Sequence, residues 1–252
     1  MANRRISGEQ RLTLISILMD RENQYIAILP ARSGSKRLPG KNLLEIAGKP
    51  LIAWSVEAAL ESGIFDRVIV SSDSVDIAQT AVDYGAEAPF LRPSGLSADD
   101  SSTVEVLIHA LEILGIGNSN QISHVACLQP TSPLRTADDI IQAKEILEKN
   151  SADAVISVCK NEHSPMWSNI LPEDNSMEDF LPIDIQLTPS QFLPQYYRLN
   201  GAIYLCDIQR MIEETTLFLK SNIYAYVMSR KNSIDIDDEV DFDLAEIYLS
   251  RG

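Results

Sequence analysis

The strongest chemical feature of this sequence is a short basic segment, residues 31–42, with the sequence ARSGSKRLPGKN. Gly34 and Gly40 would let its backbone approach a ligand closely, and the N–H groups around Ser33 could point at an anion. Lysine point charges and forked arginine donors complete what a triphosphate needs, although neither the P-loop nor the dinucleotide-binding fingerprint is present. A solvated basic loop is the alternative. The segment has no acid, and its four bases are Arg32, Lys36, Arg37 and Lys41.

A segment of opposite charge lies near the C-terminus, where residues 235–246 hold seven acids and no base. Asp235 and Asp237 alternate with isoleucines, so in extended backbone both carboxylates would face one side, about 6–7 Å apart. Two hard oxygen ligands suit Mg²⁺, which proteins hold with one or two carboxylates together with substrate phosphates. Capping and solvation are the alternative, since acids also favour the start of a helix.

Two further segments offer polar side chains that could line a site. Residues 128–135 (LQPTSPLR) follow an apolar run and supply Gln129 and Arg135. Residues 91–103 supply Arg92 and the Ser102 hydroxyl at a predicted helix start, where anions bind readily. Taken singly, each segment could be an ordinary turn.

The elements that must position these residues alternate between apolar strands and amphipathic helices. Strands are predicted at 25–30, 67–71, 122–128, 153–159, 201–206 and 223–228. Helices are predicted at 50–62, 74–84, 103–114, 136–149 and 239–249. This alternation indicates an α/β fold with a mostly parallel sheet covered by helices on both faces. Such sheets bind ligands beyond the carboxyl ends of their strands, and the basic segment lies at one such end.

Two stretches do not follow this alternation. Residues 160–197 contain five prolines and form too long a connection for a compact domain, so we expect a lid, a small subdomain or an oligomerisation arm. Residues 1–24 are predicted to be an N-terminal extension of a domain that spans 25–252. Their apolar run lacks the cleavage site of a signal peptide, and Met19 could be an alternative start.

Composition excludes several classes of protein. With 36 acids against 21 bases, the formal net charge of −15 argues against a general nucleic-acid binder and against docking on anionic membranes. No apolar run approaches the roughly 18 residues that a transmembrane helix needs. The three histidines are scattered and form no ligand pattern. The three cysteines are expected to be buried free thiols of a cytoplasmic protein: Cys127, Cys159 and Cys206.

Four motifs, in this order and spacing, resemble the acylneuraminate cytidylyltransferase family, the CMP-sialic acid synthetases, from about Tyr25 to the end of the chain. They are ARSGSKRLPGKN at 31–42, FLRP…DDSST at 90–103, LQPTSPLR at 128–135, and NGAIY at 200–204 with SIDID at 233–237. The resemblance implies a nucleotide-diphosphosugar transferase-like fold with Mg²⁺ as cofactor. It also implies transfer of CMP from CTP to the anomeric hydroxyl of a nine-carbon 2-keto sugar acid, of the N-acylneuraminate or legionaminate type, with release of pyrophosphate.

The residue pattern and the resemblance together assign roles to individual positions. The metal aspartates are Asp235 and Asp237, and a catalytic role falls to them together with Arg32 and Lys36. Nucleotide contacts are expected from Arg32, Ser33, Gly34, Lys36, Lys41, Asn42, Arg92 and Ser102. Substrate contacts are expected from Gln129, Arg198 and Asn200. Residues 160–197 resemble the family's dimerisation arm, which implies a homodimer; a lid that packs on its own domain is the alternative.

One stretch departs from the family pattern, which often has an arginine-rich sequence ahead of a Leu-Pro pair. Here residues 187–194 contain no arginine. Because a sugar carboxylate ordinarily binds an arginine fork, either Arg198 or another base supplies it, or the acceptor differs. The alternatives are a sister enzyme for pseudaminic acid or Kdo, and a non-catalytic nucleotide-binding module. The LQPTSPLR segment favours sialic or legionaminic acid, and the intact basic segment with both aspartates favours an enzyme.

Overall fold

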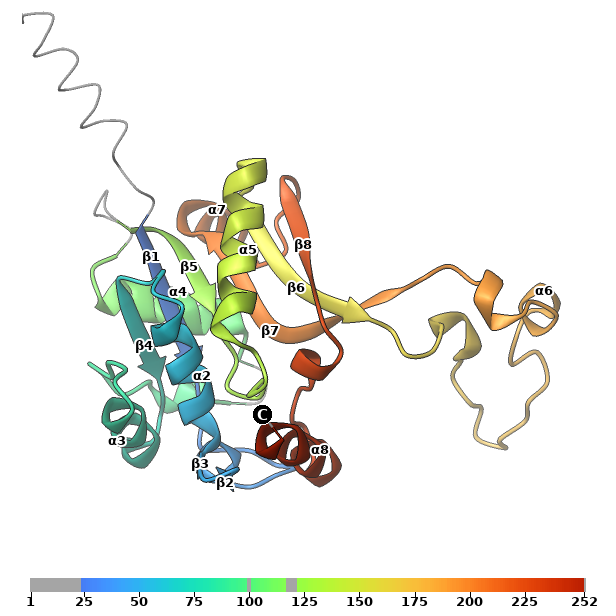
Figure 1. Ribbon diagram of the computed structural model, residues 1–252, viewed down its shortest axis with the longest axis horizontal. Helices are drawn as coiled ribbons and strands as arrows, with labels where there is room; N and C mark the ends of the chain where they lie inside the picture. Colours follow the sequence, from blue (N-terminus) through green and yellow to red (C-terminus); the bar gives the residue numbers. More distant parts are fainter. Residues whose placement is uncertain (1–23, 99–100, 117–121, 252) are drawn as a thin grey trace, which may run out of the picture.

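The computed structural model describes residues 24–98, 101–116 and 122–251, so the predicted N-terminal extension lies outside the described residues except for its last position. Its centre is a six-stranded sheet of order β4-β1-β5-β7-β6-β8 (Figure 1). The strands are β1 (Gln24–Pro30), β4 (Arg67–Ser71), β5 (Ile122–Cys127), β6 (Ala154–Lys160), β7 (Tyr197–Asp207) and β8 (Ile223–Met228). The predicted α/β fold with a mostly parallel sheet is confirmed.

One strand, β7, runs antiparallel to both of its neighbours, β5 and β6, whereas the other pairings in this sheet are parallel. The reversal has a simple cause in the path of the chain. The segment after β6 leaves the body at the carboxyl ends of the parallel strands and returns at the same end of the sheet (Figure 1). β7 therefore enters the sheet from that end and runs in the opposite direction. The strand pattern alone did not show this reversal.

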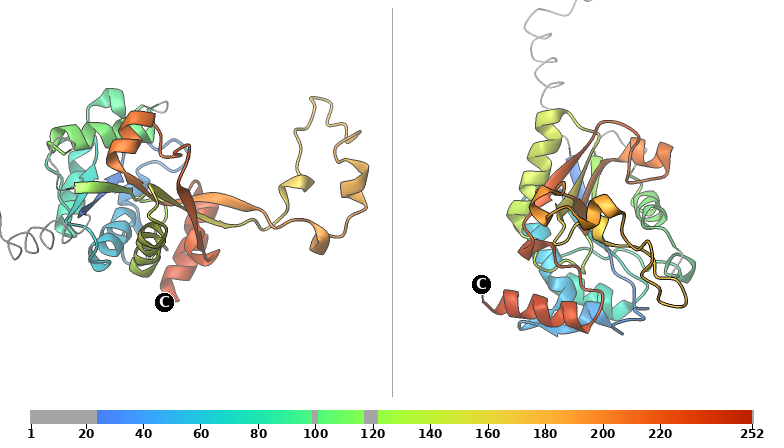
Figure 2. Two further views of the ribbon diagram at one scale, coloured as in Figure 1. Left: turned by 90° about the horizontal axis from the view of Figure 1, so that it is seen from above. Right: turned by 90° about the vertical axis from the view of Figure 1, so that its right-hand side faces the viewer.

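Helices cover both faces of the sheet (Figures 1 and 2). Three helices contribute to the hydrophobic core on one face of the sheet: α2 (Leu51–Glu61), α3 (Val75–Asp83) and α5 (Ala137–Asn150). Two helices contribute to the core on the other face: α4 (Thr103–Ile113) and α7 (Ile208–Glu214). Alternate residues of β1 enter the two cores, with Ala27 and Leu29 in one and Ile26 and Ile28 in the other. This two-sided burial explains why the strand is apolar throughout.

Local signals set the helix ends close to the predicted bounds. Ser102 and Glu105 form a capping box at the start of α4, and Thr136 caps α5 in the same way. Gly63, with φ +64°, follows α2, where a left-handed residue commonly ends a helix. Short 3₁₀ turns lie at η1 (Lys41–Leu43), η2 (Ser94–Leu96), η3 (Pro165–Trp167), η4 (Ser190–Phe192) and η5 (Lys231–Ser233).

The last helix, α8 (Glu239–Ser250), packs on a small hairpin of β2 (Glu45–Ile46) and β3 (Lys49–Pro50) instead of on the main sheet. Ile46 of the hairpin, Ala245 of α8 and the intervening Ile236 are all buried in this third cluster. The hairpin and α8 therefore hold the chain around Ile236 beside the basic segment. Neither the hairpin nor α7 was predicted.

Residues 161–196 form an arm that projects from the body, with α6 (Ile183–Gln186) near its far end (Figures 1 and 2). The arm contains only short helical turns, in agreement with the predicted irregular segment. The three cysteines are buried and free, as predicted. Among the residues that the structure describes, no helix is long and apolar enough to cross a membrane.

Candidate active site

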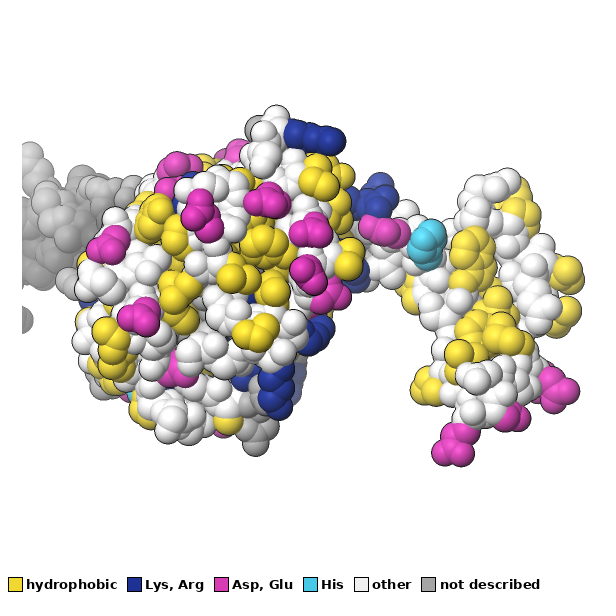
Figure 3. Space-filling view, turned by 90° about the horizontal axis from the view of Figure 1, so that it is seen from below, with side chains coloured by type: hydrophobic (Ala, Val, Ile, Leu, Met, Phe, Trp, Pro, Cys, Tyr) yellow, Lys and Arg dark blue, Asp and Glu magenta, His cyan; other side chains and the backbone are white. Residues whose placement is uncertain are grey.

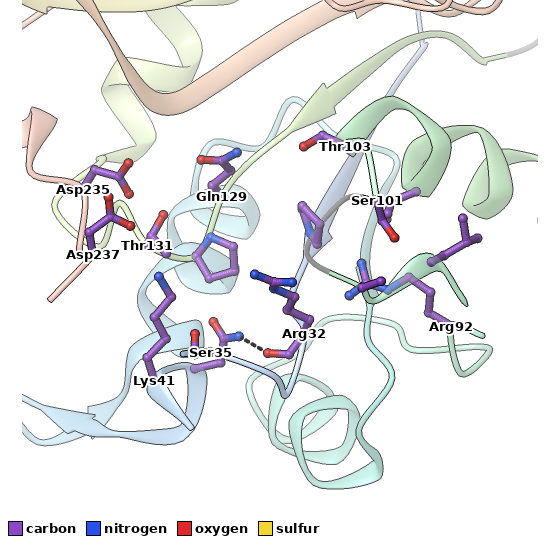
Figure 4. Close-up of a pocket in the computed structure, with 16 residues that line it drawn as sticks. Arg32, Ser35, Lys41, Arg92, Ser101, Thr103, Gln129, Thr131, Asp235 and Asp237 are labelled. Carbon is purple, nitrogen blue, oxygen red and sulfur yellow. Dashed lines mark hydrogen bonds between the residues drawn. The ribbon is translucent and has the colours of Figure 1, made fainter. Parts of the chain in front are cut away.

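A cleft of about 310 Å³ lies beyond the carboxyl ends of β1 and β5. The strands that follow β1 in the chain lie on opposite sides of it, β4 on one side and β5 on the other. Open α/β sheets bind ligands in the crevice at such a topological switch point. All four segments singled out in the sequence contribute to its wall (Figure 4). The polar lining residues are Arg32, Ser35, Lys41, Asn42, Arg92, Ser101, Thr103, Gln129, Thr131, Asp235 and Asp237.

The basic segment forms the floor of this cleft. Buried Asn42 donates from Nδ2 to the carbonyl oxygen of Arg32 (2.9 Å) and so closes the loop on itself. Lys41 Nζ donates to the carbonyl oxygen of Ile236 (2.8 Å). Burial lowers the pKa of Lys41, and the two nearby aspartates partly oppose this shift. Lys36 lines an adjoining recess beside Arg32 and Lys41, so the three predicted triphosphate ligands lie along one continuous surface.

Two predicted nucleotide contacts in the same segment lie elsewhere. The Ser33 N–H and hydroxyl donate to Asp73 at 2.8 and 2.9 Å. Ser33 and Gly34 are outside the cleft lining in the described part of the chain. Asp73 follows β4, far away in sequence, and nothing in the local pattern of either segment indicated this contact.

The opposite wall of the cleft contains a buried arginine. Arg92 is 5% exposed and donates from Nε to the Ser97 hydroxyl (3.0 Å), and burial lowers its pKa. Ser101 and Thr103 line the cleft, whereas Ser102 accepts the Glu105 N–H (3.2 Å) and caps α4. A sequence signal for this arrangement was present. The S-x-x-E spacing is that of a capping box, which engages the Ser102 hydroxyl in the helix end.

Asp235 and Asp237 face the cleft from the same side, as their alternation predicted (Figure 4). The Ile236 N–H between them donates to the Thr131 carbonyl oxygen (2.8 Å), which fixes this short extended segment. Burial raises the pKa of Asp235, and the nearby charge of Asp237 raises it further. Asp237 forms an exposed ion pair with Arg37 (3.1 Å).

This donor set fits Mg²⁺. In the described residues, no group of three or more His, Cys, Asp and Glu side chains could hold a metal ion. Two carboxylates on one wall of a polar cleft match the usual arrangement in which Mg²⁺ takes its remaining ligands from water and substrate phosphates. The basic floor places phosphate-binding groups next to these carboxylates.

The predicted substrate residues separate into two groups. Gln129 lines the cleft, whereas Arg198 and Asn200 do not. The exposed Arg198 donates to the Ser233 carbonyl oxygen (3.3 Å). Asn200 is buried; its Oδ1 accepts the Ser157 hydroxyl (2.6 Å), and its Nδ2 donates to the Ser233 hydroxyl (2.9 Å). Asn200 on β7 therefore connects β6 with η5, the turn that precedes Asp235, from beneath the site.

Comparison with known proteins gives a consistent result. The sequence model of the cytidylyltransferase family matches residues 26–180. The pseudaminic acid cytidylyltransferase of Campylobacter jejuni is 39% identical over 223 residues, which cover 88% of this chain and 94% of that protein. The CMP-N,N'-diacetyllegionaminic acid synthase of Legionella pneumophila is 36% identical over 228 residues, covering 88% and 95%. The solved structure of a CMP:2-keto-3-deoxy-manno-octonic acid synthetase complexed with CTP has a similar fold, with TM-score 0.65, 16% identity and coverage of 91% and 99%.

Proposed function

The chain belongs to the cytidylyltransferase family, and we propose that it transfers CMP from CTP to the anomeric hydroxyl of a nine-carbon 2-keto sugar acid, releasing pyrophosphate. One observation carries this proposal. One cleft at the topological switch point of the sheet combines a basic floor, a wall that contains the buried Arg92, and a pair of carboxylates. Such a combination can hold a polyphosphate while a metal ion bridges it to the acids.

The basic floor would bind the triphosphate. Lys36, Lys41 and Arg32 lie along one surface and together match the charge of a phosphate chain. Arg92 lies on the opposite wall, where the nucleoside would continue from the phosphates, beside Ser101 at the start of α4 (Figure 4). Asn42 lines the cleft from the basic segment and would contact the nucleotide from the floor. The net charge of −15 is compatible with this role because the bases are concentrated at the site.

Asp235 and Asp237 would hold Mg²⁺ against the phosphates. When bound, the ion supplies positive charge that offsets the charge developing on the phosphate oxygens. The chain's own residues would orient the reaction: the sugar hydroxyl enters from the Gln129 side and attacks the α-phosphorus. Pyrophosphate then leaves in line toward Arg32 and Lys36, which stabilise it. Transfer at phosphorus depends mainly on such positioning and charge stabilisation.

We propose an acceptor of the class for which the relatives are named. Those relatives are named for pseudaminic acid and for diacetyllegionaminic acid. The LQPTSPLR segment at 128–135, which carries Gln129 on the cleft wall, favours the sialic or legionaminic type. We further propose a homodimer formed through the arm and a cytoplasmic location, with which three buried free thiols are compatible.

A panel of acceptors tests this function. The protein is incubated with CTP, Mg²⁺ and, in turn, N-acetylneuraminate, legionaminate, pseudaminate and Kdo, and both pyrophosphate and the CMP-sugar are measured. We expect release with at least one nine-carbon acid and a product of the corresponding mass. Activity with Kdo alone would favour the sister enzyme. If no acceptor supports release although CTP binds, the protein is instead a nucleotide-binding module.

A further inference from the structure

We propose that Gly201 is a positioning residue whose missing side chain leaves room on β7 for both the Gln129 amide and the Asp235 carboxylate at the cleft wall. The proposal deepens the proposed function and rests on it, because that function places Gln129 at the acceptor and Asp235 at the metal.

The space above Gly201 is already occupied. A Cβ atom built on this residue would lie 2.7 Å from Gln129 Oε1 and 3.3 Å from Asp235 Oδ2. The first distance is shorter than real Cβ contacts, so the amide would have to move. Among the other glycines with positive φ, Gly85 would meet only the end of the Leu60 side chain, at 3.0 Å. Gly40, Gly48, Gly63 and Gly115 have no neighbouring atom within 4 Å of that position. At those four positions the backbone conformation alone explains the glycine.

The backbone around Gly201 is held in place, so the added atom could not be accommodated by a small retreat of the chain. Buried Arg135 donates from Nη1 to the carbonyl oxygens of both Gln129 (3.1 Å) and Ala202 (2.8 Å). On the Asp235 side, the Ile236 N–H donates to the Thr131 carbonyl oxygen (2.8 Å). The end of the Gln129 side chain is therefore the part that can move at low cost.

These contacts predict a specific consequence for the reaction. A methyl group at Gly201 would displace the Gln129 amide from the cleft wall and move the Asp235 carboxylate by a few tenths of an ångström. The three atoms nearest to the added methyl group belong to Gln129 and Asp235, and none belongs to Lys36 or Arg92 at the nucleotide end of the site. Acceptor use should fall much more than CTP binding.

The test compares Gly201→Ala with Gly63→Ala, whose backbone has a similar positive φ but no neighbour within 4 Å. With the best acceptor of the panel, we expect Gly201→Ala to lose on the order of 100-fold in kcat/KM for the sugar acid, with a much smaller change in the KM for CTP. Both substitutions strain a backbone of positive φ, so Gly63→Ala should lower the melting temperature about as much as Gly201→Ala does. Gly63→Ala should nevertheless keep full activity. A fully active Gly201→Ala protein would overturn the proposal.

A double-mutant cycle separates an effect through Gln129 from a general backbone effect. In a Gln129→Ala background the close contact is absent, so adding Gly201→Ala should cause a much smaller further loss than it does in the wild type. Equal losses in both backgrounds would show that the glycine acts only through the backbone. If Gly201→Ala alone does not fold, the double variant should recover folding; failure of both would also overturn the proposal.

Crystal structures of the wild type and Gly201→Ala give a result that is independent of the acceptor. We expect the Gln129 amide to be displaced in the variant, and an unmoved amide would contradict the proposal. If the wild type releases no pyrophosphate with any sugar acid, the proposed function has failed, and the two crystal structures still decide whether Gly201 positions Gln129.

Discussion

At the scale of single residues, the site joins charges that are distant in the sequence. Lys41 Nζ contacts the carbonyl oxygen of Ile236, 195 positions away, and Arg37 pairs with Asp237. The side chains of Arg37 and Asp237 are 70% and 47% exposed, so solvent weakens their attraction. Asp237 can therefore exchange this partner for a cation at little cost, which is compatible with its proposed place at Mg²⁺.

Changing Asp237 to Asn tests that place directly. We expect turnover to fall on the order of 100-fold or more, because the amide cannot supply the charge that holds the metal ion. CTP binding, measured by calorimetry, should partly survive through the basic floor. Glu239→Gln, an exposed change in the same acidic segment, is the control and should leave pyrophosphate release unchanged. Full activity of Asp237→Asn would refute the metal role.

A second residue-scale prediction concerns His124, which is buried on β5 and stacks on Tyr25 with ring centroids 5.1 Å apart. Burial lowers its pKa below the ordinary 6.5, although Asp207 and other acids oppose the shift. In the unfolded chain the imidazole binds a proton that the folded protein excludes. The contribution of His124 to the free energy of unfolding is therefore fully present above its pKa in the unfolded chain. It is lost as the pH falls from there through the lowered pKa of the folded protein.

Urea unfolding near pH 7.5 and near pH 5.5 measures this effect around the ordinary histidine pKa. The wild type should lose more stability on acidification than His124→Gln, which has no group to protonate at that position. His163→Gln, at an exposed position on the arm, is the matched control and should behave as the wild type. An equal loss in wild type and His124→Gln would contradict the prediction.

At the scale of elements, one buried carboxylate connects α5 to the far edge of the sheet. Asp139 accepts the N–H of Thr136 (2.9 Å), the hydroxyl of Tyr226 on β8 (2.9 Å) and the amide of Asn232 in η5 (2.9 Å). Burial raises the pKa of Tyr226, and its hydrogen bond to Asp139 and the charge of that carboxylate raise it further. Because η5 ends two residues before Asp235, Asp139 also holds in place the turn from which the proposed metal-site segment continues.

Replacing Asp139 by Ala should lower the free energy of unfolding by roughly 2–3 kcal/mol, since it removes half of the capping box of α5 and leaves the side-chain donors of Thr136, Tyr226 and Asn232 without this partner. Asp138→Ala provides the control, because Asp138 is the exposed neighbour on the same turn and its change should cost within about 0.5 kcal/mol. Urea denaturation measures both values. Similar losses in the two variants would show that the Asp139 network contributes no special stability.

At the scale of the whole molecule, the arm exposes an apolar surface that the body does not cover (Figure 3). The side chains of Ile170, Leu187 and Phe192 are 89%, 75% and 73% exposed. Contiguous exposed apolar surface of this kind is typical of protein–protein contacts. This observation supports the proposed homodimer more than a lid, since a lid would bury these side chains on its own body.

Light scattering coupled to gel filtration tests the dimer. At micromolar concentration we expect the wild type to have twice the chain mass, and Leu187→Glu combined with Phe192→Glu to be monomeric, because charges would be buried in the contact. Val75→Glu, on α3 of the body, starts from a comparable exposure of 64% and should remain dimeric. A monomeric wild type would contradict the prediction, and the arm would then be a lid.

The sequence by itself determined the local structure and the composition of the site. The strand at 67–71 was predicted with its observed bounds, and the period of Asp235 and Asp237 predicted that both would face one side. These features depend on backbone sterics, on side-chain periodicity and on hydrogen bonds between near neighbours, such as the Thr136 cap. Information of this kind is contained in a few consecutive residues.

Only the tertiary structure decided how those segments face one another. The reversal of β7, the engagement of Ser33 by Asp73 and the burial of Asn200 all depend on partners far away in the sequence. The crowding of Gly201 by Gln129 and Asp235 likewise requires three distant segments to converge. The same residue types could satisfy several pairings, and the packing of the two cores around one sheet selects among them.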